Sequence, residues 1–456
     1  MRKKPYTSAV KLSLFAITWP IFIESALQML MRTSDTFMLS RLSDSAVAAV
    51  GVANQLIMFT ILIFNVVSLG SSVVIMQYLG ARKTDEIGQM AATGIALNFI
   101  FGLLMSLMIT IFSGPLLRIF GLETELLKQA QTFLYIAGGA LFIQALLIAV
   151  IAIIQAHGYT KFTMFVTIGM NALNILGNYV FIYGAWGFPQ LGITGVAIAT
   201  AFSQLAALIM NLIVLTKVVH VRMKWKQLFH FRRDHVGKML KVGLPSSAVT
   251  MSYSINQLVT TAIIATLGAE MLAAKIYTSN IQFMVTILVI SIGKGMQIMV
   301  GHLVGAGELE NAYTQVFRNL RRSMIITLSA VAIIFVFRVP LLHLFTGNSA
   351  IVSIGATLLL MSFLLEPGRN CNVIIEKSLQ AAGDARFAML TSIIVTWSFS
   401  VPLTYWLGIH MDYGMVGIWA AFIVDEWLRG IILCWRWKSK IWERKSLVSS
   451  KQKVTV

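Results

Sequence analysis

Charged side chains stand inside stretches of this sequence that are otherwise apolar. The first apolar stretch, residues 12–34, contains Glu24 and Arg32, and Asp35 follows directly. A charge inside a bilayer costs about 2.5–3.5 kcal/mol on insertion scales, so such residues mark ion or substrate sites. Pro20 interrupts the helical hydrogen bonds about four turns before Asp35, which predicts a bend. A buried carboxyl group beside a bend can bind and release a proton or a cation.

Amide side chains line one face of a later apolar stretch, residues 162–184. Asn171, Asn174 and Asn178 are spaced three and four residues apart, so they share one side of a helix. Asparagines in a membrane helix hold helices together through hydrogen bonds, and the same amides can line a cation site. Both interpretations stay open here.

A second group of charges lies further along the chain. Glu366 and Arg369 are three residues apart, and Pro367 and Gly368 between them predict local unwinding. The pair either neutralises itself and holds the helix, or contributes to a second site. Lys294 either pairs with Glu366 or faces a substrate as a cation. A structural ion pair is the favoured interpretation of three later charges: Asp425, Glu426 and Arg429.

The elements that position these residues are membrane helices. Hydrophobic residues make up 57% of the 456 residues and charged residues 12%, with a mean hydropathy of +0.79. A helix of about 20 apolar residues crosses the hydrocarbon core. The sequence predicts twelve such spans, at residues 12–34, 46–76, 88–112, 130–155, 162–184, 193–216, 242–267, 277–303, 323–345, 352–380, 388–410 and 414–437.

The two halves of the sequence repeat each other at a constant offset of 225 residues. The matched residues are Pro20 and Pro245, Gly80 and Gly305, Pro115 and Pro340, Gln155 and Gln380, and Gly158 and Gly383. Six spans in each half give both halves one orientation, related by a pseudo-two-fold axis along the membrane normal. We expect an all-α membrane protein of two six-helix bundles: an N-lobe (1–216), a basic amphipathic linker (217–241), a C-lobe (242–437) and a basic tail (438–456).

Lysine and arginine gather on one side of the predicted membrane. Only five fall on the other side: Arg41, Arg118, Lys128, Lys275 and Arg338. Both termini are therefore expected in the cytoplasm. This asymmetry also explains the net charge of +18, since the basic loops suit anionic lipid headgroups and contain no nucleic-acid module.

Other function classes find little support in the composition. The two cysteines, Cys371 and Cys434, lie in apolar stretches and imply no disulfide framework. An integral membrane enzyme would need clustered acidic metal ligands or a histidine-rich motif, and the histidines are scattered. We expect no catalysis, cofactor or metal.

Several motifs resemble those of the multidrug and toxic compound extrusion (MATE) transporters. They are SDTFMLSRLSDSAVAAVGVANQL after the first span, IMQYLGARKTDE after the second, and QAAGDARF after the tenth, with ALNILGNYVFIYGAWGFPQLGITGVAIATAFSQ across the fifth and sixth. The resemblance covers about residues 10–437. It implies a V-shaped, two-lobed bundle around a central cavity, acting as a monomer in the cell membrane. Such a protein exports amphipathic organic cations in exchange for H+ or Na+.

The resemblance also suggests site residues. Pro20 and Asp35 match the bending proline and the ion-coupling aspartate of the first helix, and Asn174 and Thr200 match their polar neighbours. Many members carry an aspartate where this chain has Asn178. The secondary candidates are Lys294, Glu366 and Arg369.

Two departures favour proton coupling through Asp35 over sodium coupling in the C-lobe. One branch of the family has a glutamate in the seventh span, but residues 243–268 of this chain contain no acid. The same branch has an aspartate in the tenth span, and this chain has Arg369 near that position. The alternative is a lipid-linked saccharide flippase of the same broader superfamily. Such a flippase would line its cavity with cations for a pyrophosphate, and Lys294 and Arg369 are the C-lobe candidates.

Overall fold

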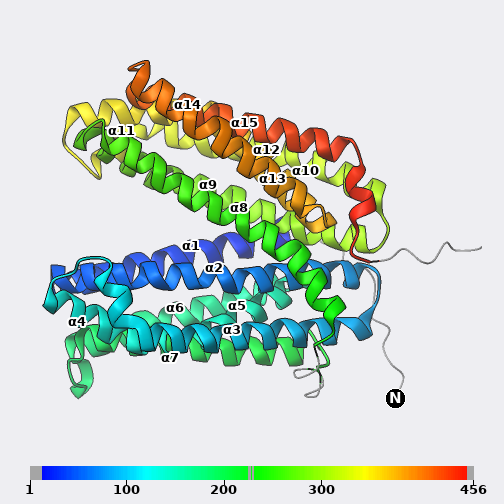
Figure 1. Ribbon diagram of the computed structural model, residues 1–456, viewed down its shortest axis with the longest axis horizontal. Coiled ribbons are helices and arrows are strands. Elements are labelled where there is room, and N and C mark those ends of the chain that lie inside the picture. The colour runs from blue at the N-terminus through cyan, green and yellow to red at the C-terminus, as the bar shows by residue number, and fades with distance from the viewer. Residues whose placement is uncertain (1–12, 224–226, 228–230, 449–456) are drawn as a thin grey trace, which may run out of the picture. The chain divides into compact units, whose positions relative to one another are not determined.

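The chain folds into helices that group into two compact units. The computed structural model describes residues 13–223, 227 and 231–448, and these residues contain helices and no strand. The N-unit comprises Trp19–Leu79 and Lys83–Leu244; the described part of the C-unit comprises residues 13–18, 80–82 and 245–448. Within each unit the long helices run side by side (Figure 1).

The helices of the first half follow the predicted spans and extend beyond most of them. They are α1 (Leu14–Ser40), α2 (Asp44–Gly80), α3 (Thr84–Arg118), α4 (Thr124–Phe133), α5 (Leu141–Ala156), α6 (Thr160–Tyr183) and α7 (Gly192–Ile213). The predicted span 130–155 is a bent pair, since α4, with the π-helical turn Leu134–Gly138 that continues it, meets α5 at 47°.

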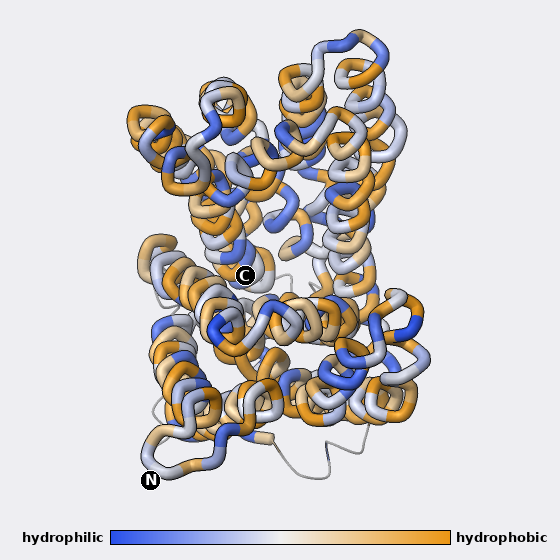
Figure 2. The backbone as a smooth tube through the Cα atoms, turned by 90° about the vertical axis from the view of Figure 1, so that its left-hand side faces the viewer, coloured by the Kyte–Doolittle hydropathy of each residue, from blue (hydrophilic) through white to orange (hydrophobic). Residues whose placement is uncertain are grey.

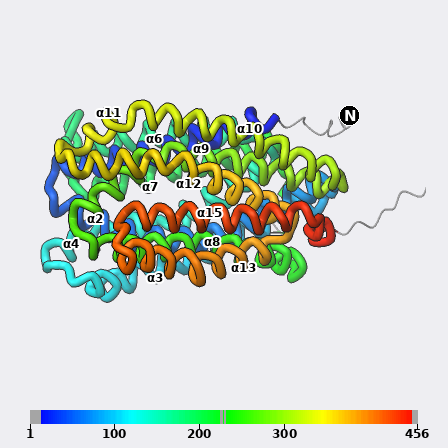
Figure 3. The backbone as a smooth tube through the Cα atoms, turned by 90° about the horizontal axis from the view of Figure 1, so that it is seen from above, coloured from blue at the N-terminus to red at the C-terminus, as the bar shows by residue number. Residues whose placement is uncertain are grey.

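The second half repeats this order. Its helices are α8 (Arg233–Ala265), α9 (Ala269–Gly305), α10 (Leu309–Val336), α11 (Arg338–His343), α12 (Ser349–Ala382), α13 (Ala385–Val395), α14 (Val401–Tyr405) and α15 (Gly414–Lys438). The predicted span 323–345 is wrong as a single helix, because α10 ends at Val336 and α11 begins two residues later. Phe337 leaves helical geometry, with φ −95° and ψ 13°, shortly before Pro340. Figure 3 shows α9, α10, α12 and α15 of the C-unit from above.

The described helices confirm an all-α membrane fold. Nine of them are long and apolar enough to cross a membrane, or ten if the bent pair counts as one span. The apolar colour follows the helices, and many polar residues lie in the turns (Figure 2). Of the remaining predicted spans, α8 has serine, asparagine and glutamine along its length and α15 contains three charges within five residues. The count of twelve therefore stays a prediction.

The predicted linker and tail are partly helical. Residues 233–241, assigned from sequence to the linker, form the first turns of α8, and residues 224–226 and 228–230 lie outside the described ones. In the tail, a 3-10 turn follows α15, and its buried Trp442 stacks on Trp437 with 4.1 Å between ring centroids. Residues 449–456 of the tail also lie outside the described part of the chain.

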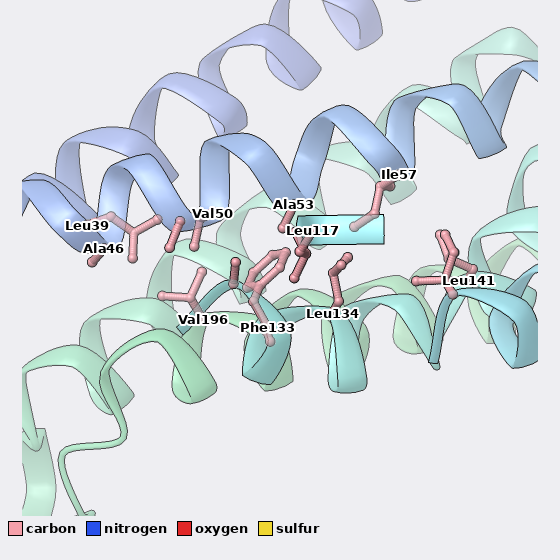
Figure 4. Close-up of a cluster of buried hydrophobic side chains, with 14 of the residues drawn as sticks. Leu39, Ala46, Val50, Ala53, Ile57, Leu117, Phe133, Leu134, Leu141 and Val196 are labelled. Carbon is pink, nitrogen blue, oxygen red and sulfur yellow. The ribbon is translucent and has the colours of Figure 1, made fainter. Parts of the chain in front are cut away.

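The C-terminal end of α1 is anchored in the apolar core of the N-unit. Leu39 is 1% exposed and packs in a cluster with Ala46, Val50 and Ala53 of α2 (Figure 4). Phe133 and Leu134, at the junction of α4 and the π-helical turn, complete the same cluster (Figure 4). Because Leu39 lies one helical turn after Asp35, this packing fixes the direction in which the helix presents its carboxylate.

The first helix of each half begins in one unit and continues in the other. Residues 14–18 of α1 belong to the C-unit, where Leu14 and Thr18 pack against Gly295 of α9. Residues 233–244 of α8 belong to the N-unit, where the backbone of Met239 lies directly on Gly70 of α2. The changes of unit fall at Thr18–Trp19 and Leu244–Pro245, next to the repeated prolines. The missing side chain of glycine leaves room for the Met239 backbone at Gly70 and for the Leu14 and Thr18 side chains at Gly295.

Candidate functional site

The polar group of the N-unit joins three helices around Asp35. This residue faces α6, where Asn178 donates from Nδ2 to Asp35 Oδ1 at 2.6 Å. Asn178 Nδ2 also lies 3.4 Å from Asn174 Oδ1, and Asn174 Nδ2 donates to Thr200 Oγ1 of α7 at 3.2 Å. The structure therefore brings together four of the residues proposed from sequence. Pro20, the fifth, lies fifteen residues before Asp35 on the same helix.

The spacing of the asparagines explains this arrangement. Asn174 and Asn178 are four residues apart on one face of α6, and both are 0% exposed. A buried amide without a partner is costly, so α1 and α7 supply acceptors on either side. Asn171, one turn earlier, is 4% exposed, and among the described residues its amide finds no hydrogen-bond partner. The asparagines of α6 thus both hydrogen-bond to a neighbouring helix and contact the carboxylate of Asp35.

A second acid of α1 lies in its own polar niche. Glu24 is 5% exposed, and its Oε2 accepts from Gln155 Nε2 at 3.0 Å and from Thr163 Oγ1 at 2.9 Å. Gln155 recurs in the second half of the sequence as Gln380. This repeat was the one sequence signal that could have pointed to the contact between Gln155 and Glu24. The N-unit therefore offers two candidate carboxyl groups on one helix.

Charges of the C-unit form a network between α12 and α15. Arg369 Nη1 donates to Glu366 Oε1 at 2.6 Å and to Thr286 Oγ1 of α9 at 3.0 Å. Arg369 Nε donates to Glu426 Oε1 of α15 at 3.3 Å, and Asn372 Nδ2 donates to Glu426 Oε2 at 2.7 Å. The network explains why α12 tolerates an arginine whose side chain is only 15% exposed.

The remaining charges of α15 complete this network. Arg429 pairs with Asp425 and lies 3.3 Å from Glu426, so the favoured structural ion pair of these three residues is present. Glu366 pairs with Arg369, and the role of Lys294 stays a prediction. No pattern in the sequence points to the roles of Thr286 and Asn372, because these roles depend on the packing of distant segments.

The chain resembles known transporters over nearly its whole length. The family model described as MatE matches twice, at residues 20–180 and 245–406, in keeping with the internal repeat. The "Uncharacterized transporter YisQ" of Bacillus subtilis is 42% identical over 435 residues, covering 95% of this chain and 96% of that protein. The "Probable multidrug resistance protein NorM" of Thermotoga maritima is 24% identical and covers 96% and 95% of the two chains.

Solved structures show the same fold. The "Crystal structure of MATE in the bent conformation" superposes with a TM-score of 0.87 at 20% identity, covering 95% of this chain and 98% of that one. At that identity the likeness establishes the fold of the helices, and the side chains of the site have to be judged on their own geometry.

Proposed function

Because the chain belongs to the MatE family of multidrug and toxic compound extrusion transporters, we propose that it exports amphipathic, mostly cationic organic compounds in exchange for protons. Relatives named multidrug resistance proteins support this substrate class. The observation that carries the coupling proposal is the contact between Asp35 and Asn178. The amide presents its N–H group, and not its oxygen, to the carboxylate.

This geometry favours a proton over a sodium ion. A hard cation takes several oxygen ligands, and an N–H group pointing at the carboxylate does not provide one. A proton needs only the carboxyl oxygen. Among the described residues, Asn178 is the one hydrogen-bond partner of the Asp35 side chain, so no basic group competes for the proton.

The proposed cycle uses the charge of Asp35 as the switch. Facing outward, Asp35 takes a proton, α1 bends at Pro20, and the site loses its attraction for a cation, which leaves. Facing inward, Asp35 releases the proton and attracts the next cation. One net charge crossing about 100 mV yields about 2.3 kcal/mol, worth roughly a 50-fold gradient. Exchange of one monovalent cation for one proton moves no net charge, so it depends on the pH gradient alone.

The location follows from the same proposal. The protein spans the cell membrane several times, with both termini in the cytoplasm and its basic loops on anionic lipid headgroups. A monomer contains the complete Asp35 group, because α1, α6 and α7 of one chain supply it.

The test compares the two acids of α1 in proteoliposomes with separately imposed H+ and Na+ gradients. Asp35→Asn is expected to abolish proton-driven uptake of a cationic dye. Glu24→Gln retains an oxygen that accepts from Gln155 and Thr163, and it is expected to leave proton-driven uptake intact. Retained uptake in the Asp35→Asn variant would rule out the coupling role, and loss in Glu24→Gln alone would move that role to Glu24. Uptake driven by Na+ alone would overturn the choice of ion.

One contact of the C-unit bears on the flippase alternative. A pyrophosphate group needs cations that are free to bind it, whereas Arg369 is occupied by Glu366 and Glu426. This pairing supports the exporter over the flippase.

A further inference from the structure

Arg32 is a charged residue of α1 that the coupling site does not use. Its side chain is exposed, and no residue in the described part of the chain forms a hydrogen bond or an ion pair with it. Asp35 lies only three residues away, yet the two side chains do not pair. An arginine at this depth in a membrane helix is costly unless it faces water or a ligand.

The side of α1 that carries Arg32 is polar over several turns. Ser25, Gln28, Arg32 and Thr36 follow one another at spacings of three and four residues, so they form a stripe along the helix. Of the exposed apolar residues of α1, Leu30 lies on another side and Phe37 borders the stripe. A polar stripe of this length suits contact with water or a polar ligand and does not suit contact with lipid tails.

The direction of the side chain argues against simple contact with the outer headgroups. Arg32 lies eight residues before Ser40, the last residue of α1. Side chains of a helix tilt toward its N-terminus, and in the orientation proposed above that direction leads from the outer surface toward the membrane centre. Reaching the outer headgroups would oppose this tilt.

A shallow depression of about 450 Å³ lies over the same part of the helix, lined by Arg32, Thr33, Thr36, Phe37 and Ser40. The hydroxyls of Thr33, Thr36 and Ser40 donate to backbone carbonyls one turn earlier. Their oxygens are therefore left as acceptors, and the Arg32 guanidinium is left as the donor. Phe37 adds an aromatic face.

We propose that Arg32 is a specificity-determining residue that binds the carboxylate of zwitterionic aromatic substrates. The guanidinium binds the carboxylate, the hydroxyl oxygens accept from a ligand N–H group, and Phe37 contacts the ring. This inference rests on the proposed export function and narrows its substrate class: the preferred compounds carry an anionic group in addition to a cationic one. Asp35 one turn away is placed to attract the cationic group.

The test uses two dyes that differ in one group: the cationic ethyl ester of a rhodamine and its zwitterionic free carboxylic acid. Dissociation constants are measured with purified protein in detergent, and proton-driven uptake is measured in proteoliposomes. The wild type is expected to bind the free acid more tightly than the ester. Arg32→Gln is expected to weaken binding of the free acid about tenfold or more, the size of a lost charge-assisted hydrogen bond, with little change for the ester.

Two further variants sharpen the comparison. Arg32→Lys keeps the charge and is expected to restore part of the preference for the free acid. Arg118→Gln removes another exposed arginine, in the last turn of α3, and is expected to change neither constant.

Each remaining outcome has a defined meaning. A wild type without preference for the free acid, or an Arg32→Gln variant that binds both dyes like the wild type, overturns the role of Arg32. If the ester is still taken up with the pH gradient in that case, the proposed function survives. Uptake of neither dye refutes the export proposal itself. Weakened affinity of Arg32→Gln for vesicles of anionic lipid, with dye binding unchanged, would assign Arg32 to headgroups and also overturn the inference.

Discussion

Replacing Asn178 by leucine removes the single N–H group that the described structure directs at Asp35. The lost contact is a hydrogen bond of 2.6 Å to a carboxylate. Hydrogen bonds to charged groups contribute about 1.5–3 kcal/mol, and about 1.4 kcal/mol corresponds to a factor of ten in an equilibrium constant. In the Asn178→Leu variant the charged carboxylate of Asp35 loses that stabilisation relative to the protonated carboxyl group. We therefore expect the pH at half-maximal transport to rise by about one to two units.

The assay is the initial rate of dye uptake into proteoliposomes, measured at a series of external pH values with a fixed pH difference across the membrane. The matched control is Asn171→Leu. Asn171 lies on the same face of α6 and is also buried, but its amide has no partner among the described residues. Its replacement removes the same polar group without leaving an acceptor unpaired, so the pH profile should stay in place. An equal shift in both variants, or none in Asn178→Leu, would refute the link between the amide and the coupling carboxylate.

Two further predictions concern stability, measured as the thermal unfolding midpoint in detergent. Gly243→Ala places a Cβ 2.9 Å from the carbonyl carbon of Val66, and overpacking of this kind costs about 1–3 kcal/mol, so the midpoint should fall. Gly237→Ala, on the same helix with open space around it, should leave the midpoint unchanged or raise it, and equal midpoints would contradict the proposed contact. Arg369→Met leaves Glu366 and Glu426 buried without their shared cation, a loss of about 3–5 kcal/mol. An unchanged midpoint in that variant would show that the network is dispensable.

The N-unit group was within reach of sequence reasoning because its parts follow helical spacing. Asn174 and Asn178 share a face by their four-residue interval, and the family resemblance pointed to Asp35 and Thr200 as their neighbours. The partners of Arg369 could not all be predicted in this way. Glu366 is close in sequence, but Glu426 is 57 residues away and meets Arg369 only through the packing of α12 on α15. No periodicity in one helix can indicate which residue of another helix it touches.

Helix ends were the other weak point of the sequence reasoning. Hydropathy locates the apolar middle of a span, whereas α2 and α9 continue to Gly80 and Gly305, where polar loops begin. The break before α11 depends on the local geometry of Phe337, which composition does not report.

The shared helices α1 and α8 have a consequence for any attempt to divide the gene. A polypeptide that stops after α7 would lack the α8 residues that cover Gly70, and one that starts after residue 232 would lack the α1 residues that cover Gly295. Neither fragment carries all the pieces of its own compact body. Co-expressed as separate polypeptides, the two fragments should rescue each other, whereas each produced alone should be degraded.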